Sequence, residues 1–84
     1  MYQSKEMAAP VSEDGYTKLA NAIVVRAAQD YRQALRALKR NPKNDAAQNT
    51  VREAERFFRS GWYQALTAVD GEYLIEMLRK EELR

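Results

Sequence analysis

Cysteine and histidine are both absent from the 84 residues of this chain. Without them the chain can form no disulfide, no zinc site of the Cys or Cys/His type and no Ser–His or Cys–His catalytic pair. Carboxylates remain, and Glu72 and Glu76 stand four residues apart. Two acidic residues at this spacing are typical of a solvated helix face rather than of acid–base chemistry. We therefore expect a protein that is not an enzyme and that holds no metal or cofactor.

Glycine and proline are scarce as well, with three and two residues. The glycines stand singly at positions 15, 61 and 71, so no glycine-rich phosphate-binding loop is present. No apolar run approaches the roughly 18 residues that a bilayer-spanning helix needs. Residues 1–15 also lack the continuous apolar stretch of a signal peptide. These absences favour a cytoplasmic protein with no membrane partner.

Bulky apolar residues are fewer than the composition first suggests. Apolar residues make up 45% of the chain, but 13 of them are alanine, which buries little area. A chain of this length forms one domain with a modest core. Domains of this size often gain stability from a disulfide, a metal or a second subunit. Because the composition disfavours the first two, we predict a homo-oligomer, with a homodimer as the expected form.

The spacing of the apolar residues predicts an all-α fold: a long antiparallel helical hairpin, then a short helix and a C-terminal helix. Residues 1–15 show no period and contain Pro10 and a Ser-Glu-Asp-Gly turn. We expect them to form a mobile N-terminal arm ahead of a single helical domain over residues 16–84.

The first helix of the hairpin is expected over residues 17–40. An apolar stripe runs along one side of it, with members alternately four and three apart: Ala20, Val24, Ala27, Tyr31, Ala34 and Leu38. Glu13 and Asp14 precede its start, where the helix dipole favours negative charge. Pro42 ends it, because proline disfavours helical geometry in the residue before it.

The second helix is expected over residues 45–59. Asp45 as N-cap with Gln48 three residues later resembles a capping box. An apolar face follows: Ala47, Thr50, Val51, Ala54, Phe57 and Phe58. The loop of about four residues between the helices implies that the two apolar faces pack against each other.

Ser60 and Gly61 interrupt the helical pattern, and the sequence is compatible with either a break or a kink there. A short helix is expected over residues 61–67. The last helix starts with Asp70 as its N-cap, and its buried side is expected to hold Leu74, Ile75 and Leu78.

Five of the eight aromatic residues lie between positions 57 and 75. Exposed rings interleaved with arginines would suit base stacking. Phe57 and Phe58, however, share the apolar phase of the second helix, and an alanine-rich interior needs bulky side chains. We therefore expect most of this block to form the core. Trp62 and Tyr63 fall at the edge of the apolar stripe and are the aromatic residues expected to contact a partner.

Positive charge is concentrated in the middle of the chain. Residues 18–59 hold ten basic and four acidic residues, a net charge of +6, whereas the segments on either side carry −2 each. Helical geometry places these basic residues on outward faces of the hairpin, where they suit phosphates or an acidic protein but also match an ordinary solvated surface. With Lys43 in the loop beside them, the predicted partner-binding residues are Arg32, Arg36, Lys39, Arg40, Arg52, Arg56, Arg59, Trp62 and Tyr63.

Two segments, "AIVVRAAQDYRQALRALKRNP" and "AERFFRSGWYQALTAVDGEYLIEMLRKE", resemble small, mostly uncharacterised proteins of phages and prophages of Gram-positive gut bacteria. The features that carry the resemblance are Asp30-Tyr31, Asn41-Pro42, the ERFFRS-x-W stretch and the DGE-x-LI-x-x-L stretch, within residues 20–82. The resemblance implies a phage accessory context and no particular activity.

In that context we expect stoichiometric binding to a host or phage protein. The sharpest form of this hypothesis is an inhibitor of a host defence system, for example of the anti-CRISPR type. The alternative is nucleic-acid binding through the basic face of the hairpin, and a structural role in the virion is a third hypothesis.

Overall fold

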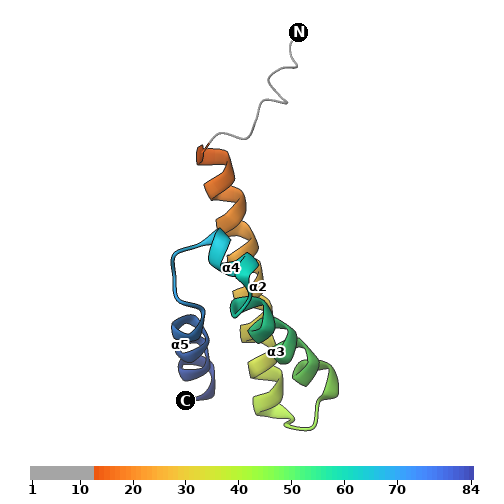
Figure 1. Ribbon diagram of the computed structural model, residues 1–84. Coiled ribbons are helices and arrows are strands. Elements are labelled where there is room, and N and C mark those ends of the chain that lie inside the picture. The colour runs from red at the N-terminus through yellow and green to blue at the C-terminus, as the bar shows by residue number, and fades with distance from the viewer. Residues whose placement is uncertain (1–12) are drawn as a thin grey trace.

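The computed structural model describes residues 13–84, and over this range it contains four helices and no strand (Figure 1). The predicted all-α fold is therefore confirmed. Residues 1–12, which make up most of the expected N-terminal arm, lie outside the described residues.

Helix α2, Glu13–Arg40, is the longest element, and its 28 residues give a rod of about 42 Å. The helix start expected near Thr17 is wrong, because residues 13–15 are already helical. Acidic residues suit a first helical turn as well as a loop ahead of it, and a single glycine such as Gly15 costs a helix only about 1 kcal/mol. The hydroxyl of Tyr16 also donates a hydrogen bond to the carbonyl oxygen of Ala65, 3.3 Å away, which ties this end to the rest of the fold.

Helix α3, Asp45–Phe58, returns antiparallel to α2 after the loop of residues 41–44. Its N-cap is Asn44 rather than the expected Asp45: the Asn44 side chain accepts a hydrogen bond from the backbone N–H of Ala47 at 3.0 Å. Asn and Asp are equally good N-caps, so local preference could not choose between neighbours. Gln48 does not close a capping box, because its amide donates to the carbonyl oxygen of Pro42 at 2.8 Å.

A break, not a kink, follows at Ser60. The Ser60 backbone is extended, and its hydroxyl accepts a hydrogen bond from the backbone N–H of Tyr63 at 3.1 Å while donating to the carbonyl oxygen of Phe57 at 2.6 Å. One hydroxyl therefore serves the end of α3 and the start of α4, Gly61–Leu66. The expected boundary at Ser60 is confirmed.

Helix α5, Gly71–Leu83, lies against both arms of the hairpin (Figure 1). Asp70 is its N-cap, as predicted, and accepts from the backbone N–H of Glu72. Ion pairs join the end of α5 to the second half of α2 and the start of α5 to the end of α3. Thus α5 runs parallel to α2 and antiparallel to α3.

The core lies where these helices meet. Its buried members come from all four of them: Tyr31, Leu35, Ala54, Phe58, Tyr63, Ile75 and Leu78. The predicted apolar faces of the hairpin and of the last helix are confirmed by this set. Phe57 and Phe58 both pack in or against it, so the expected core role for most of the aromatic block is also confirmed.

Candidate functional site

Two of the predicted partner-binding arginines are ion-paired within the chain. Arg32 lies 3.0 Å from a carboxylate oxygen of Glu81, and Arg36 lies 2.8 Å from one of Glu82. Arg36 makes a two-pronged contact, since a second guanidinium nitrogen donates to the other Glu82 oxygen at 3.2 Å. This hydrogen bonding lowers the pKa of Glu82. The charges of these two arginines are therefore matched by α5, although both side chains remain partly exposed.

Arg59 is held in the same way at the other end of α5. Its guanidinium hydrogen-bonds both carboxylate oxygens of Glu72, which lowers the pKa of that carboxyl. It also lies 3.6 Å from Glu55 one turn earlier on α3. Arg59 thus fastens the start of α5 to α3, and its charge is matched by carboxylates of this chain.

The two aromatic residues that were expected to contact a partner, Trp62 and Tyr63, lie in different environments. Tyr63 is only 1% exposed and packs edge-on against Phe57 and Phe58 at 5.7 Å, so its expected place on an outward surface is wrong. The break at Ser60 starts a new helix, and the phase carried over from α3 no longer applies beyond it. Trp62 is 61% exposed, with one edge against Phe57. Trp62 therefore remains open to a partner.

Among the described residues, the remaining predicted cations form no ion pair with an Asp or Glu side chain, although Lys39 contributes to the lowered pKa of Glu82. Lys39 donates to the backbone carbonyl of Arg84 at 3.2 Å, and Arg52 donates to the Asn49 side chain. Within residues 13–84 the side chains of Arg40 and Arg56 have neither a hydrogen bond nor an ion pair. The same holds for the Lys43 side chain in the loop.

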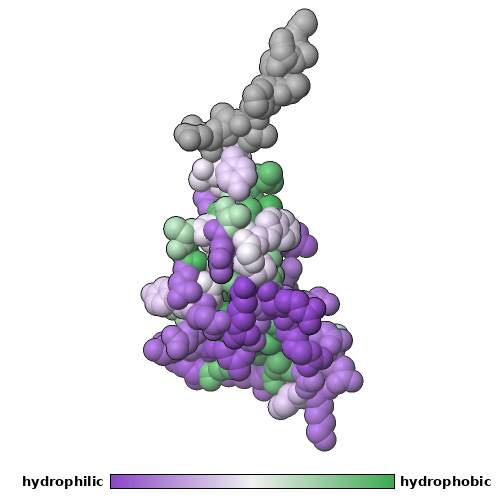
Figure 2. All heavy atoms as spheres, viewed as in Figure 1, coloured by the Kyte–Doolittle hydropathy of each residue, from purple (hydrophilic) through white to green (hydrophobic). Residues whose placement is uncertain are grey.

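Four of these cations lie at or near the closed end of the hairpin: three are in or beside the loop of residues 41–44, and Arg52 is about two turns into α3. We call Lys39, Arg40, Lys43 and Arg52 the cationic end. The acidic neighbours of the cationic end are Asp45 in the first turn of α3 and Glu81 and Glu82 of α5, which lie beside Lys39 and Arg40. Glu81 and Glu82 are ion-paired with Arg32 and Arg36, so the local charge remains positive. Figure 2 shows hydrophilic residues over most of the half of the molecule that contains α3, α5 and the second half of α2, with small apolar areas between them.

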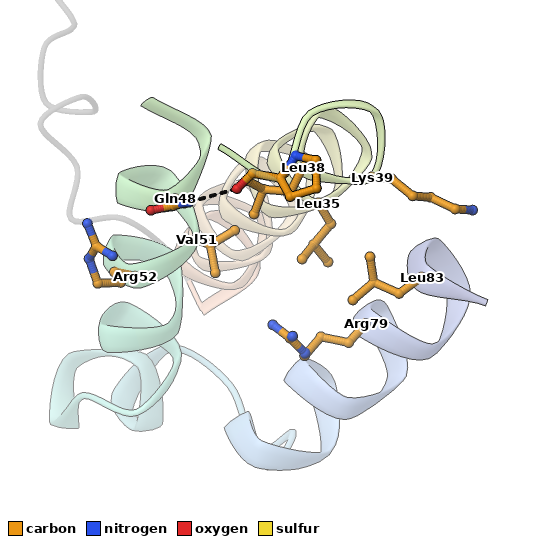
Figure 3. A pocket seen from close by; sticks show the side chains of 9 residues that line it. Leu35, Leu38, Lys39, Gln48, Val51, Arg52, Arg79 and Leu83 are labelled. Carbon is orange, nitrogen blue, oxygen red and sulfur yellow. Dashed lines mark hydrogen bonds between the residues drawn. The ribbon is translucent and has the colours of Figure 1, made fainter. Parts of the chain in front are cut away.

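An apolar groove opens beside the cationic end, where α2, α3 and α5 converge (Figure 3). Its volume is about 360 Å³. Figure 3 shows Leu35, Val51 and Leu83 pointing toward the space between the helices, with Arg79 entering from α5. Arg52 and Lys39 extend from opposite edges of the groove in this view, and no acidic residue lines it.

The inner end of the groove is fixed by a polar triad that sequence reasoning missed. The buried Tyr31 hydroxyl donates to Glu55 at 2.6 Å, and Arg79 donates to the same carboxylate oxygen at 3.1 Å. Burial, and then the hydrogen bond to Glu55, raises the pKa of Tyr31 from 10.0 to about 12. The available signal was Arg79 itself, a cation directly after Leu78 in the buried phase of α5. Its partners, however, lie 24 and 48 positions away.

We expect Tyr31→Phe to lower the free energy of unfolding by about 2 kcal/mol at neutral pH, because a hydrogen bond to a carboxylate is lost. Since the folded-state pKa of Tyr31 is raised, the unfolded chain ionises first as pH increases from 10.0 toward about 12. The wild type should therefore lose stability over this window, and its advantage of about 2 kcal/mol over the Phe variant should disappear. Urea unfolding at a series of pH values measures both effects.

Tyr63→Phe is the matched control. The Tyr63 hydroxyl is buried and has no hydrogen-bond partner among the described residues, so its removal should cost nothing or stabilise the fold slightly. Equal losses for the two Tyr→Phe variants at neutral pH would contradict the role given to the triad.

Within residues 13–84, no three side chains of the metal-binding types come together in a way that could hold an ion. None of the helices in this range combines the length and the apolar character needed to cross a membrane.

In comparisons with family models, curated proteins and solved structures, none matches this chain. The resemblance to phage and prophage proteins stays a prediction from the sequence.

Proposed function

We propose that this chain is a non-enzymatic protein that binds a partner protein stoichiometrically through the cationic end. The observation that carries the proposal is the division of the basic residues. Arg32, Arg36 and Arg59 are ion-paired with carboxylates of the chain itself. Among the described residues no member of the cationic end forms such an ion pair, although Lys39 lies near enough to Glu82 to contribute to the lowered pKa of that carboxyl. Exposed, unmatched cations of this kind attract and orient an acidic partner.

A protein is favoured over a nucleic acid as the partner, because the cationic end lies beside an apolar groove. Binding to a phosphate backbone gains affinity from each cation that contacts it, and three arginines of the predicted basic face are engaged elsewhere. The cationic end adjoins an apolar groove instead, and apolar contact flanked by charge is typical of protein interfaces. Nucleic-acid binding is the alternative that the experiment below separates.

The resemblance to phage and prophage proteins supports a host protein as the partner. Antagonism of a host defence system is the sharpest form of the proposal, because a small binder without catalytic groups acts by occupying a surface. Self-association would be compatible with it: Leu19, Val25 and Trp62 are exposed apolar side chains away from the cationic end, and the predicted homodimer stays a prediction.

The test compares two double variants with the same change in net charge. Arg40→Glu with Lys43→Glu reverses charge at the cationic end. Lys18→Glu with Lys80→Glu does so at exposed lysines outside it. Each tagged protein is incubated with a nuclease-treated lysate of Gram-positive bacteria at physiological salt, and retained proteins are identified.

We expect the wild type and the Lys18/Lys80 variant to retain the same protein, and the Arg40/Lys43 variant to lose at least about tenfold of it. Retention of no protein by the wild type would overturn the proposal. Retention that occurs only in a parallel lysate without nuclease treatment, or binding to DNA or RNA that the Arg40/Lys43 variant loses, would favour the nucleic-acid alternative.

A further inference from the structure

We infer that the apolar groove receives a segment of the partner protein in which apolar side chains are flanked on both sides by carboxylates. This inference rests on the proposed function and specifies the chemistry of the partner.

The floor can hold one or two apolar side chains. Leu35, Leu38 and Val51 are partly or fully buried and belong to the hairpin, whereas Leu83 comes from α5 and is 41% exposed. A volume of about 360 Å³ lies at the lower end of the roughly 300–1,000 Å³ that is typical of ligand sites. Because the groove is open to solvent rather than enclosed, it suits side chains of a peptide laid across it. Insertion would remove the exposed part of Leu83 from water.

The charged residues that line the groove favour a partner segment with negative charge. Lys39, Arg52 and Arg79 line the groove together with the neutral Gln48 and Pro42. Arg52 bonds the neutral side-chain oxygen of Asn49, and Lys39 bonds the main-chain oxygen of Arg84. A hydrogen bond to a carboxylate is stronger than one to a neutral oxygen. Arg79 already serves Glu55 and Tyr31, so it holds the inner end of the groove and is not counted as a free cation.

The positions of the two available cations set the pattern of the segment. Lys39 belongs to α2 and Arg52 to α3, and they extend from opposite edges of the groove (Figure 3). A segment with acidic residues on only one side of its apolar pair could contact only one of these two cations. Acidic residues on both sides of the apolar pair can reach both.

The inference is tested with a fluorescein-labelled peptide that carries a Leu-Leu pair between glutamates. Two control peptides replace the leucines by serines or the glutamates by lysines. Leu83→Glu places a negative charge in the groove, at a half-exposed position, where it would repel the acidic peptide. Arg52→Glu reverses the charge of one rim cation. Leu19→Glu, at a leucine that is 57% exposed and does not line the groove, is the matched control. Circular dichroism checks the folding of each variant.

By fluorescence anisotropy, we expect the wild type and Leu19→Glu to bind the acidic Leu-Leu peptide at least about tenfold more tightly than either control peptide. Leu83→Glu and Arg52→Glu should each weaken binding by a similar factor. Equal binding of the serine peptide, or unchanged binding by Leu83→Glu and Arg52→Glu, would overturn the inference.

The lysate experiment separates failure of this inference from failure of the proposed function. If Leu83→Glu retains the partner as the wild type does while the Arg40/Lys43 variant loses it, the groove is not the docking site but the cationic end is. If the wild type retains no partner, the proposed function fails. Loss of the partner by both variants, with retention by Leu19→Glu, supports both.

Discussion

Replacement of Gly71 by alanine is expected to lower the free energy of unfolding by about 3 kcal/mol, the upper end of the usual range for overpacking. A Cβ atom at this position would lie 2.0 Å from the carbonyl oxygen of Phe58 and 2.9 Å from its carbonyl carbon. Both are backbone atoms at the end of α3, so no side-chain rotation relieves the clash. The helices α3 and α5 would have to move apart, and the core between them would open.

Gly61→Ala is the matched control, because a Cβ built there meets no atom within 4 Å beyond its chain neighbours and its own helix backbone. Gly61 is the first residue of α4, and alanine favours a helix over glycine by up to about 1 kcal/mol. Urea unfolding should therefore show Gly61→Ala to be neutral or slightly stabilising. If the two substitutions had the same effect, the close approach of α5 to the end of α3 would not exist as described.

Phe58→Ala is expected to cost about 3–5 kcal/mol, the usual range for removing a buried phenylalanine. Phe58 is 1% exposed. Its ring packs at 5.6–5.7 Å from the rings of Tyr31, Phe57 and Tyr63. The cavity would thus lie at the point where three of the helices share side chains.

Trp62→Ala provides the comparison, because it removes a larger ring that is 61% exposed and should cost about 1 kcal/mol. A domain of this length has a total stability of about 4–13 kcal/mol, so Phe58→Ala could unfold the chain outright. Phe58→Leu, with a smaller expected loss, keeps the comparison measurable by urea unfolding. A greater loss for Trp62→Ala than for Phe58→Leu would contradict the placement of the core.

The elements that local sequence predicts well are those with local causes. Pro42 predicts the end of α2, the apolar stripe through Tyr31 predicts the face that α3 covers, and Asp70 is an N-cap with no competing neighbour. At the start of α3 two equivalent caps, Asn44 and Asp45, stand side by side, and the choice depends on how the loop enters the helix.

The candidate site was predicted less well because its electrostatics are non-local. Arg32 and Arg36 have the spacing of a solvated basic face, yet their partners Glu81 and Glu82 lie 49 and 46 positions away. Helical periodicity carries no information about such pairs. Tyr63 was misplaced for a different reason: the direction of a side chain after a helix break depends on the new helix axis, which the apolar phase of α3 does not define.

The parallel course of α5 beside α2 also bears on the order in which the molecule is assembled. Contacts between α2 and α3 close a loop of four residues, whereas those of α5 with α2 span more than forty positions, and contacts between distant positions form more slowly. During synthesis α2 and α3 emerge before α5. The polar triad would therefore lack Arg79 until α5 packs against the hairpin, and the groove would lack the side formed by α5. The ability to bind at this groove would therefore appear only when α5 has docked.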